Sequence, residues 1–199
     1  AILRAKGKEA QAEMVRNIVP AGIECMFVRQ AEQLGLGHAV LCAERAVGGD
    51  PFTVLLADDF LTDYEPGVTA DLVQAFAASG KSQLSVMEVD GPEIAQYGVV
   101  VPSVSGAGIA GLVEKPSASD APSNLASIGR YVLTPDFFDT LRGLRAGTGG
   151  EIQLADAINI HAQSGLVEMV RLNGKRFDCG SVAGFMAASS HEFASRGFC

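Results

Sequence analysis

Apolar and polar positions alternate along the chain in two distinct periods. Short apolar runs predict strands at 23–28, 52–57, 83–89, 97–101, 109–113, 126–133 and 167–172. Apolar residues at helical spacing, or segments bounded by turn residues, predict helices at 1–17, 38–46, 69–79, 151–163 and 182–193. The run 52–57 is apolar throughout, which is typical of a central strand buried on both faces.

Strands therefore alternate with helices, with one interruption. Small residues at 103–108 separate two valine-rich segments, a pattern that predicts a β-hairpin. Strand–helix alternation indicates an α/β fold in three layers, Rossmann-like, with a mixed, mostly parallel sheet. The hairpin would be a small insertion into it. We found no internal repeat and no long linker, so a single domain over 1–199 is expected.

Composition and charge exclude some classes of binding partner. The chain has 199 residues, of which 48% are hydrophobic, and a formal net charge of −8. An acidic protein is a poor general ligand for nucleic acid or anionic membranes, since both require clustered Lys and Arg. No apolar stretch of about 18 residues is present, so no membrane association is expected. The four cysteines form no CxxC pair, which predicts reduced thiols in a cytoplasmic protein.

Polar residues follow several of the predicted strands directly. In open α/β sheets, ligands bind beyond the carboxyl ends of the strands. The residues found there are Gln30, Asp58, Asp59, Glu114, Lys115 and, just past the last strand, Lys175 and Asp178. We expect carboxylates, a lysine and an amide from this set to converge on one edge of the sheet. No Walker pattern and no GxSxG nucleophile motif accompanies them.

Asp58 and Asp59 end an apolar strand. Carboxylate oxygens there are suitable ligands for Mg²⁺ shared with phosphates. A turn or a helix cap is an equally common reason for aspartate at such a position. Neighbouring side chains need not point the same way, so Asp58 is the preferred ligand and Asp59 is secondary.

The other candidates are weaker when taken singly. Lys115 could hold a phosphate as a point charge, and Glu114 could accept hydrogen bonds from sugar hydroxyls. An exposed Glu-Lys ion pair is the more common alternative. Gln30 carries the donor and acceptor that match a base edge, and the glycines at 35 and 37 allow close backbone approach, although such a loop is usually only a turn.

In order, these segments resemble the nucleoside-diphosphate-sugar pyrophosphorylases, and most closely their bacterial UTP–glucose-1-phosphate uridylyltransferase branch. The resemblance rests on nine short strings spread over most of the chain. They are Val28–Gln30, Gly35–Leu41, Leu55–Asp59, Tyr97–Val100, Val113–Pro116, Ala121–Ala126, Gly129–Tyr131, Gly150–Leu154 and Lys175–Gly180. The family's N-terminal strand and its glycine-rich, arginine-bearing loop have no counterpart among these strings, so the expected domain lacks them.

The resemblance implies a role for each matched position. It implies Mg²⁺ binding by Asp58 and Asp178, and catalytic roles for Asp58 and Lys115, the latter on the sugar-linked phosphate. It implies uracil contacts for Gln30 and Gly35, and a glucose site formed by Gly98, Glu114, Asn124 and Gly129.

The implied reaction joins UTP and α-D-glucose 1-phosphate into UDP-glucose with release of pyrophosphate, in a nucleotidyltransferase that forms homodimers or homotetramers. Three alternatives stay open. The first is another nucleotide-sugar pyrophosphorylase that makes dTDP-glucose or ADP-glucose. The second is a glycosyltransferase with a metal held by aspartates. The third is a non-catalytic sugar-nucleotide-binding subunit.

Overall fold

The computed structural model describes residues 2–104 and 106–197. Its strands are β1 (Phe52–Leu55), β2 (Asp59–Thr62), β3 (Ser82–Glu88), β4 (Gly98–Pro102), β5 (Ile109–Glu114), β6 (Leu125–Leu133), β7 (Val167–Arg171) and β8 (Lys175–Asp178). Its α-helices are α1 (Ile2–Ala5), α2 (Glu9–Arg16), α3 (Leu36–Cys42), α4 (Glu44–Val47), α5 (Val68–Ser79), α6 (Asp136–Gly143), α7 (Leu154–Gln163) and α8 (Val182–Ser195). Two 3₁₀ turns span Gly91–Gln96 and Thr148–Gly150.

The central sheet has six strands in the order β5-β4-β6-β3-β7, with β1 also paired to β6. The α/β class, the mixed sheet and the β4–β5 hairpin were predicted correctly. The prediction of a mostly parallel sheet was wrong. Among the described strands only β3 and β7 pair in parallel, because β6 runs opposite to all three of its neighbours. A second, two-stranded sheet pairs β2 with β8 antiparallel.

Strand β6 organises the site because it supports two strands on one edge. Along its other edge it pairs with β3, with one interruption. On the near edge, Ala126 pairs with Val99 of β4, and the segment 130–133 pairs with β1. Strands β1 and β4 therefore separate from each other beside residues 127–129.

A β-bulge marks the same place. The β3–β6 register shifts so that Leu84 opposes Tyr131 while Ser85 opposes Ile128, leaving Gly129 and Arg130 unpaired with β3. The buried Ser85 hydroxyl lies 3.2 Å from the Ile128 carbonyl oxygen and 2.9 Å from that of Arg130. Bulges re-aim the backbone and concentrate near active sites. Here the bulge turns Gly129 toward the loop between β1 and β2.

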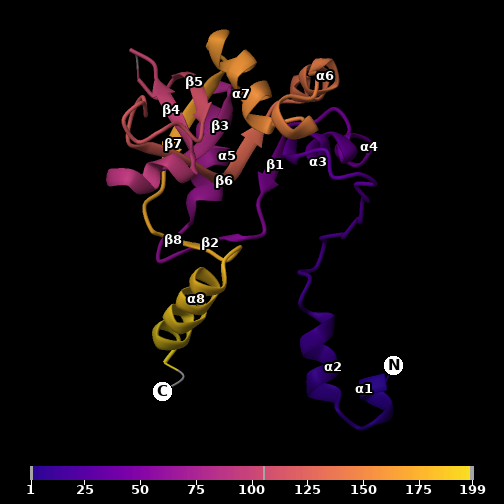
Figure 1. Cartoon of the computed structure of the whole chain (residues 1–199). Coiled ribbons are helices and arrows are strands. Elements are labelled where there is room, and N and C mark those ends of the chain that lie inside the picture. Colours follow the sequence, from indigo (N-terminus) through magenta and orange to yellow (C-terminus); the bar gives the residue numbers. More distant parts are fainter. Residues whose placement is uncertain (1, 105, 198–199) are drawn as a thin grey trace.

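Helices cover both faces of the large sheet. Alternate residues of β6 point to opposite sides: Tyr131 and Leu133 belong to the main core with Phe137, whereas Val132 packs with Leu72 of α5. Helices α3, α6 and α7 lie on the main-core side and α5 on the other, which makes three layers (Figure 1). No helix of the described residues is long and apolar enough to cross a membrane.

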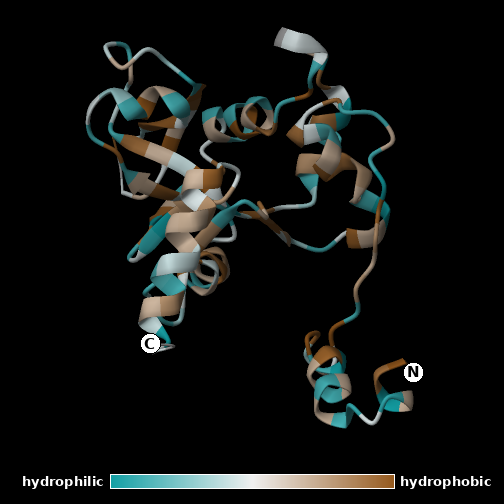
Figure 2. Ribbon diagram, turned by 60° about the horizontal axis from the view of Figure 1, so that its bottom comes forward, coloured by the Kyte–Doolittle hydropathy of each residue, from teal (hydrophilic) through white to brown (hydrophobic). Residues whose placement is uncertain are grey.

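Two strand predictions failed because an apolar run does not specify its partner. Residues 23–28 form no strand, and Phe27 is 95% exposed. Together with α1 and α2 they form an arm that extends away from the body (Figures 1 and 2). The run 52–57 forms not a central strand but a short one, β1, which pairs only with β6 within the described chain; Leu55 is 53% exposed.

Candidate nucleotide-sugar site

The separation of β1 from β4 leaves a hollow over the middle of β6. It holds about 200 Å³, less than the roughly 300–1,000 Å³ of typical small-molecule pockets, so it suits one part of a larger ligand. Five predicted site residues or their neighbours line it: Asp58, Asp59, Gly98, Glu114 and Gly129. Of the residues predicted to converge, the structure brings Asp58, Asp59 and Glu114 together here, over the middle of β6 rather than at one edge of a single sheet. Four others do not line the hollow: Gln30, Lys115, Lys175 and Asp178.

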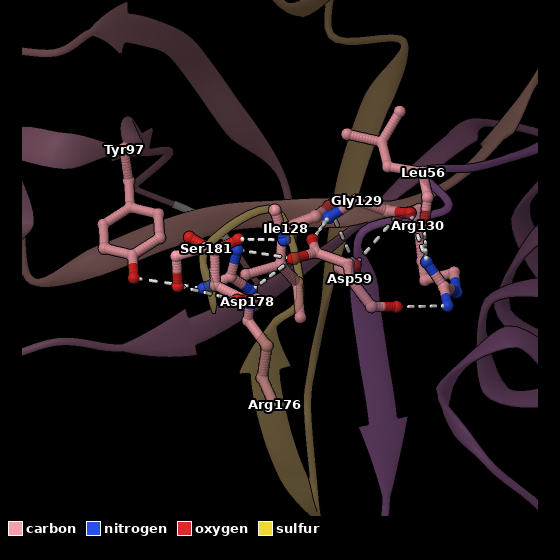
Figure 3. Close-up of polar contacts among 11 residues, drawn as sticks. Leu56, Asp59, Tyr97, Ile128, Gly129, Arg130, Arg176, Asp178 and Ser181 are labelled. Atoms are coloured by element: carbon pink, nitrogen blue, oxygen red, sulfur yellow. Dashed lines mark hydrogen bonds and ion pairs between the residues drawn. The ribbon is translucent and has the colours of Figure 1, made fainter. Parts of the chain in front are cut away.

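Asp59 lies at the centre of a buried network rather than facing the hollow as a free ligand (Figure 3). Its Oδ2 accepts a hydrogen bond from the backbone N–H of Gly129 at 2.6 Å. Its Oδ1 accepts one from Arg176 Nε at 2.6 Å and is also paired with Arg176 Nη2. A buried carboxylate in a native fold must be compensated in this way. The preference for Asp58 over Asp59 as a metal ligand is consistent with this geometry.

Gly129 has no room for a side chain. A Cβ at this position would lie 2.6 Å from Leu56 Cβ and 2.7 Å from Asp59 Oδ2, closer than real Cβ atoms come. The glycine is therefore required by the approach of the β1–β2 loop. Its carbonyl also accepts a hydrogen bond from the Leu56 N–H at 2.9 Å.

Arg130 fastens the same loop to β6. Its guanidinium donates to the carbonyl oxygens of Leu56 at 3.0 Å, Gly129 at 2.8 Å and Asp59 at 2.7 Å. Burial lowers the pKa of Arg130, against the opposing effect of the carboxylates of Asp59 and Asp58. Burial also acts to lower the pKa of Arg176, but the hydrogen bonds and charge of Asp59 outweigh it, and that pKa is raised. Asp59 therefore holds Arg176 as a cation, whereas at Arg130 the effect of burial is the larger one.

The carboxylates of Asp58 and Asp178 converge beside Gly180. A Cβ at Gly180 would lie 3.1 Å from Asp178 Oδ1 and 3.3 Å from Asp58 Oδ2. The Cys179 N–H donates to the Asp58 carbonyl at 2.7 Å, and Asp178 pairs with Asp59 across the β2–β8 ladder. Two exposed carboxylates are a donor set that fits Mg²⁺, which takes one or two of them plus substrate phosphates. No group of three or more potential metal-ligating side chains occurs in the described residues.

Gly98, Glu114 and Lys115 lie together at the ends of the hairpin strands. Gly98 pairs with Glu114, and a Cβ at Gly98 would approach Glu114 Oε2 to 3.1 Å. The Lys115 N–H donates to the Tyr97 carbonyl at 3.1 Å. Lys115 has φ of 46°, a left-handed conformation that costs a non-glycine residue about 1–3 kcal/mol. Such backbone strain is concentrated at binding sites.

The Gln30 and Gly35 loop packs near the hollow, and its next residue, Leu36, lines it. Gln30 Nε2 donates to the Gly35 carbonyl at 3.1 Å and lies 3.0 Å from His38 Nδ1. Gly35 has φ of 92°, and a Cβ there would lie 2.8 Å from the Ile152 carbonyl. The glycine is needed for this conformation and this close approach.

Asn124 is placed elsewhere. Its side-chain amide donates to Asp90 Oδ1 at 3.2 Å, and it lines a separate surface hollow. The residues missed by the sequence reasoning are Arg130, Arg176 and Tyr97 in its side-chain role. All three occur inside strings already noted, but the sequence around them carries no local signal that their side chains are paired.

Comparison with known proteins identifies the family. The nucleotidyl transferase family matches residues 1–194. The chain belongs to this family. A UTP–glucose-1-phosphate uridylyltransferase from Pseudomonas aeruginosa is 42% identical over 173 residues, covering 84% of the chain and 62% of the relative. One from Haemophilus ducreyi is 38% identical over 197 residues, covering 94% of the chain and 67% of the relative.

Solved structures of related proteins superimpose on most of the chain. A UDP-glucose pyrophosphorylase from Acinetobacter baumannii superimposes with a TM-score of 0.87 at 36% identity, covering 98% of the chain and 69% of that protein. A UDP-glucose pyrophosphorylase complexed with UDP-glucose gives 0.84 at 38% identity, covering 95% and 73%. The chain thus spans about two thirds of the length of these family members, and less in the case of the first relative.

Proposed function

We propose that this nucleotidyltransferase chain carries the site that makes UDP-glucose and pyrophosphate from UTP and α-D-glucose 1-phosphate. One observation carries the proposal: Asp58, Gly98 and Glu114 line one hollow. The carboxylate of Asp178 lies beside that of Asp58 at Gly180, and Lys115 follows Glu114 in sequence. The similarity to relatives named for this activity supports the choice of base and sugar.

The reaction requires no enzyme nucleophile. An anionic phosphate oxygen of glucose 1-phosphate attacks the α-phosphorus of UTP in line. The bond from that phosphorus to the oxygen bridging the β-phosphate breaks, and pyrophosphate leaves with the electron pair. Because the attacking oxygen is already anionic, no proton has to be removed. Catalysis then consists of positioning and charge stabilisation.

Each group of residues contributes to one part of this. Bound Mg²⁺ would neutralise phosphate charge as it develops. Asp58 and Asp178 would hold it, since their carboxylates converge. Lys115 would bind the phosphate of glucose 1-phosphate. Glu114, which pairs with Gly98, would accept hydrogen bonds from the hydroxyl groups of the glucose ring. Gln30 and Gly35 would contact the uracil from the loop before α3, and Gly129 would shape the floor of the glucose site. Asn124, which lines a separate hollow, is left out of the glucose site.

Location and assembly belong to the same proposal. Cys25, Cys42 and Cys179 are free, which supports a reducing, cytoplasmic location. A homodimer or homotetramer is proposed from the family resemblance.

Ligand-dependent thermal stability tests the proposal directly. The chain is heated with Mg²⁺ and UDP-glucose, ADP-glucose or dTDP-glucose, each at the same concentration. A ligand at about 100 times its dissociation constant adds about 2.7 kcal/mol of stability. We expect a rise in Tm with UDP-glucose that exceeds the other two, and a smaller rise for Asp58→Asn. A larger shift with ADP-glucose or dTDP-glucose would reassign the base, and equal shifts with all three would refute the uridine specificity.

A further inference from the structure

The two parts of the proposed site come from two different sheets. Asp58 and Asp178 are positioned by the β2–β8 ladder, whereas Gly98, Glu114 and Lys115 are positioned by the β4–β5 hairpin. No backbone ladder joins these two sheets among the described strands. Their relative placement therefore depends on the short loops that lead into β2 and β8 and on side-chain contacts between the sheets.

Arg176 spans this division (Figure 3). It lies on β8, and its Nε donates to Asp59 Oδ1 at 2.6 Å. Its Nη1 donates to the Tyr97 hydroxyl at 3.1 Å, and its Cζ lies 5.2 Å from the Tyr97 ring centroid. One guanidinium thus contacts both the two-stranded sheet and the residue that precedes β4.

Both partners of Arg176, Asp59 and Tyr97, are sequence neighbours of residues in the proposed site. Asp59 follows Asp58 in sequence and opposes Asp178 in the ladder. Tyr97 precedes Gly98, and its carbonyl accepts the Lys115 N–H at 3.1 Å. A shift of the guanidinium would therefore be passed on to both groups of residues.

Burial makes the contact specific. The side chains of Arg176 and Asp59 are 13% and 5% exposed, unlike a surface ion pair that contributes little. A lysine keeps the charge but is a point donor without the planar fork, so it cannot bond Asp59 and Tyr97 in the same geometry.

We propose that Arg176 is a positioning residue that sets the metal-binding carboxylates of the β2–β8 ladder in register with the sugar-phosphate residues at the ends of the β4–β5 hairpin. This rests on the proposed function and extends it. Arg176 acts through Asp59 and Tyr97, and neither contact needs the substrate.

The test uses three variants of the full chain. Arg176→Lys keeps the charge and removes the fork. Tyr97→Phe removes one hydroxyl and keeps the ring. Lys175→Gln is the matched control, because Lys175 is the adjacent cation on β8 and its 3.0 Å ion pair with Asp63 is exposed and outside the hollow. Each protein is assayed for kcat, for KM of glucose 1-phosphate, for Mn²⁺ binding by electron paramagnetic resonance, and for Tm.

For Arg176→Lys we expect kcat to fall and Mn²⁺ binding to weaken, each by about 10-fold or more, the range seen when residues that orient metal ligands are replaced. For Tyr97→Phe we expect KM for glucose 1-phosphate to rise with Mn²⁺ binding unchanged. Lys175→Gln should match the parent chain in all four.

Three results would overturn the proposal. The first is that Arg176→Lys equals Lys175→Gln in Mn²⁺ binding and in kinetics. The second is a normal KM for glucose 1-phosphate in Tyr97→Phe. The third is that the losses in Arg176→Lys follow its Tm alone while Tyr97→Phe is unaffected. If the parent chain releases no pyrophosphate with any nucleotide, the proposed function fails. The Mn²⁺ comparison between Arg176→Lys and Lys175→Gln still decides the positioning role at the carboxylates.

Discussion

Gly129→Ala probes the contact between the β1–β2 loop and the bulge of β6. The added methyl would lie 2.6 Å from Leu56 Cβ and 2.7 Å from Asp59 Oδ2, so the loop must retreat by several tenths of an ångström. Overpacking of this kind costs about 1–3 kcal/mol. The retreat also weakens the 2.6 Å hydrogen bond from the Gly129 N–H to the buried Asp59 carboxylate, a bond to a charged group worth about 1.5–3 kcal/mol.

We therefore expect Gly129→Ala to lower the free energy of unfolding by about 3 kcal/mol or more, a large share of the 5–15 kcal/mol typical of a domain. Urea unfolding followed by circular dichroism measures the change as a shift in midpoint at constant slope. Gly143→Ala is the matched control, since it ends α6 and nothing lies within 4 Å of its added methyl. That control should be neutral or up to about 1 kcal/mol more stable. Equal midpoints for the two variants would refute the close-approach argument.

Two further predictions concern the metal site and the core. Asp58→Ala should reduce turnover by at least about 100-fold in a pyrophosphate-release assay, because stabilisation of phosphate charge by a metal is worth several kcal/mol, and near-normal turnover would contradict the assignment. Burial lowers the pKa of His161 below 6.5, so the fold resists a proton that the unfolded chain accepts, and stability present above pH 6.5 is lost as pH falls. His161→Phe should flatten this loss, by up to about 1.4 kcal/mol per pH unit, in urea titrations between about pH 5 and 7; identical slopes for the variant and the parent chain would exclude His161 as the cause.

The sequence predicted the elements better than their arrangement. The hairpin, β3, β6, β7, α5 and α8 lie within one or two residues of the predicted ranges because their periodicity and turn residues are local signals. Strand direction is not local. An apolar run has the same composition whether it pairs parallel or antiparallel, so the reversal of β6 left no trace in the pattern.

The sequence pattern also did not show which segments and side chains contact one another. Residues 23–28 have the composition of a strand and yet pair with nothing in the described chain, so propensity alone did not decide their state. At the site, the strand-end rule pointed to Asp58 and Glu114, but it placed them at one edge of a mostly parallel sheet, whereas they line a hollow over the middle of β6. The Asp59–Arg176 pair could not be predicted, because it joins residues 117 positions apart in two strands whose pairing the pattern did not indicate.

Two requirements conflict at Lys115. The left-handed backbone favours glycine, whereas phosphate binding requires the lysine side chain. Glycine would adopt φ of 46° without the cost that lysine bears. Glycine would also remove the ammonium group proposed to bind the sugar phosphate. Selection for thermal stability alone would thus favour Lys115→Gly. The resulting protein would be more stable but would bind the sugar phosphate more weakly. Position 115 should therefore be held fixed when thermostable variants of this chain are sought.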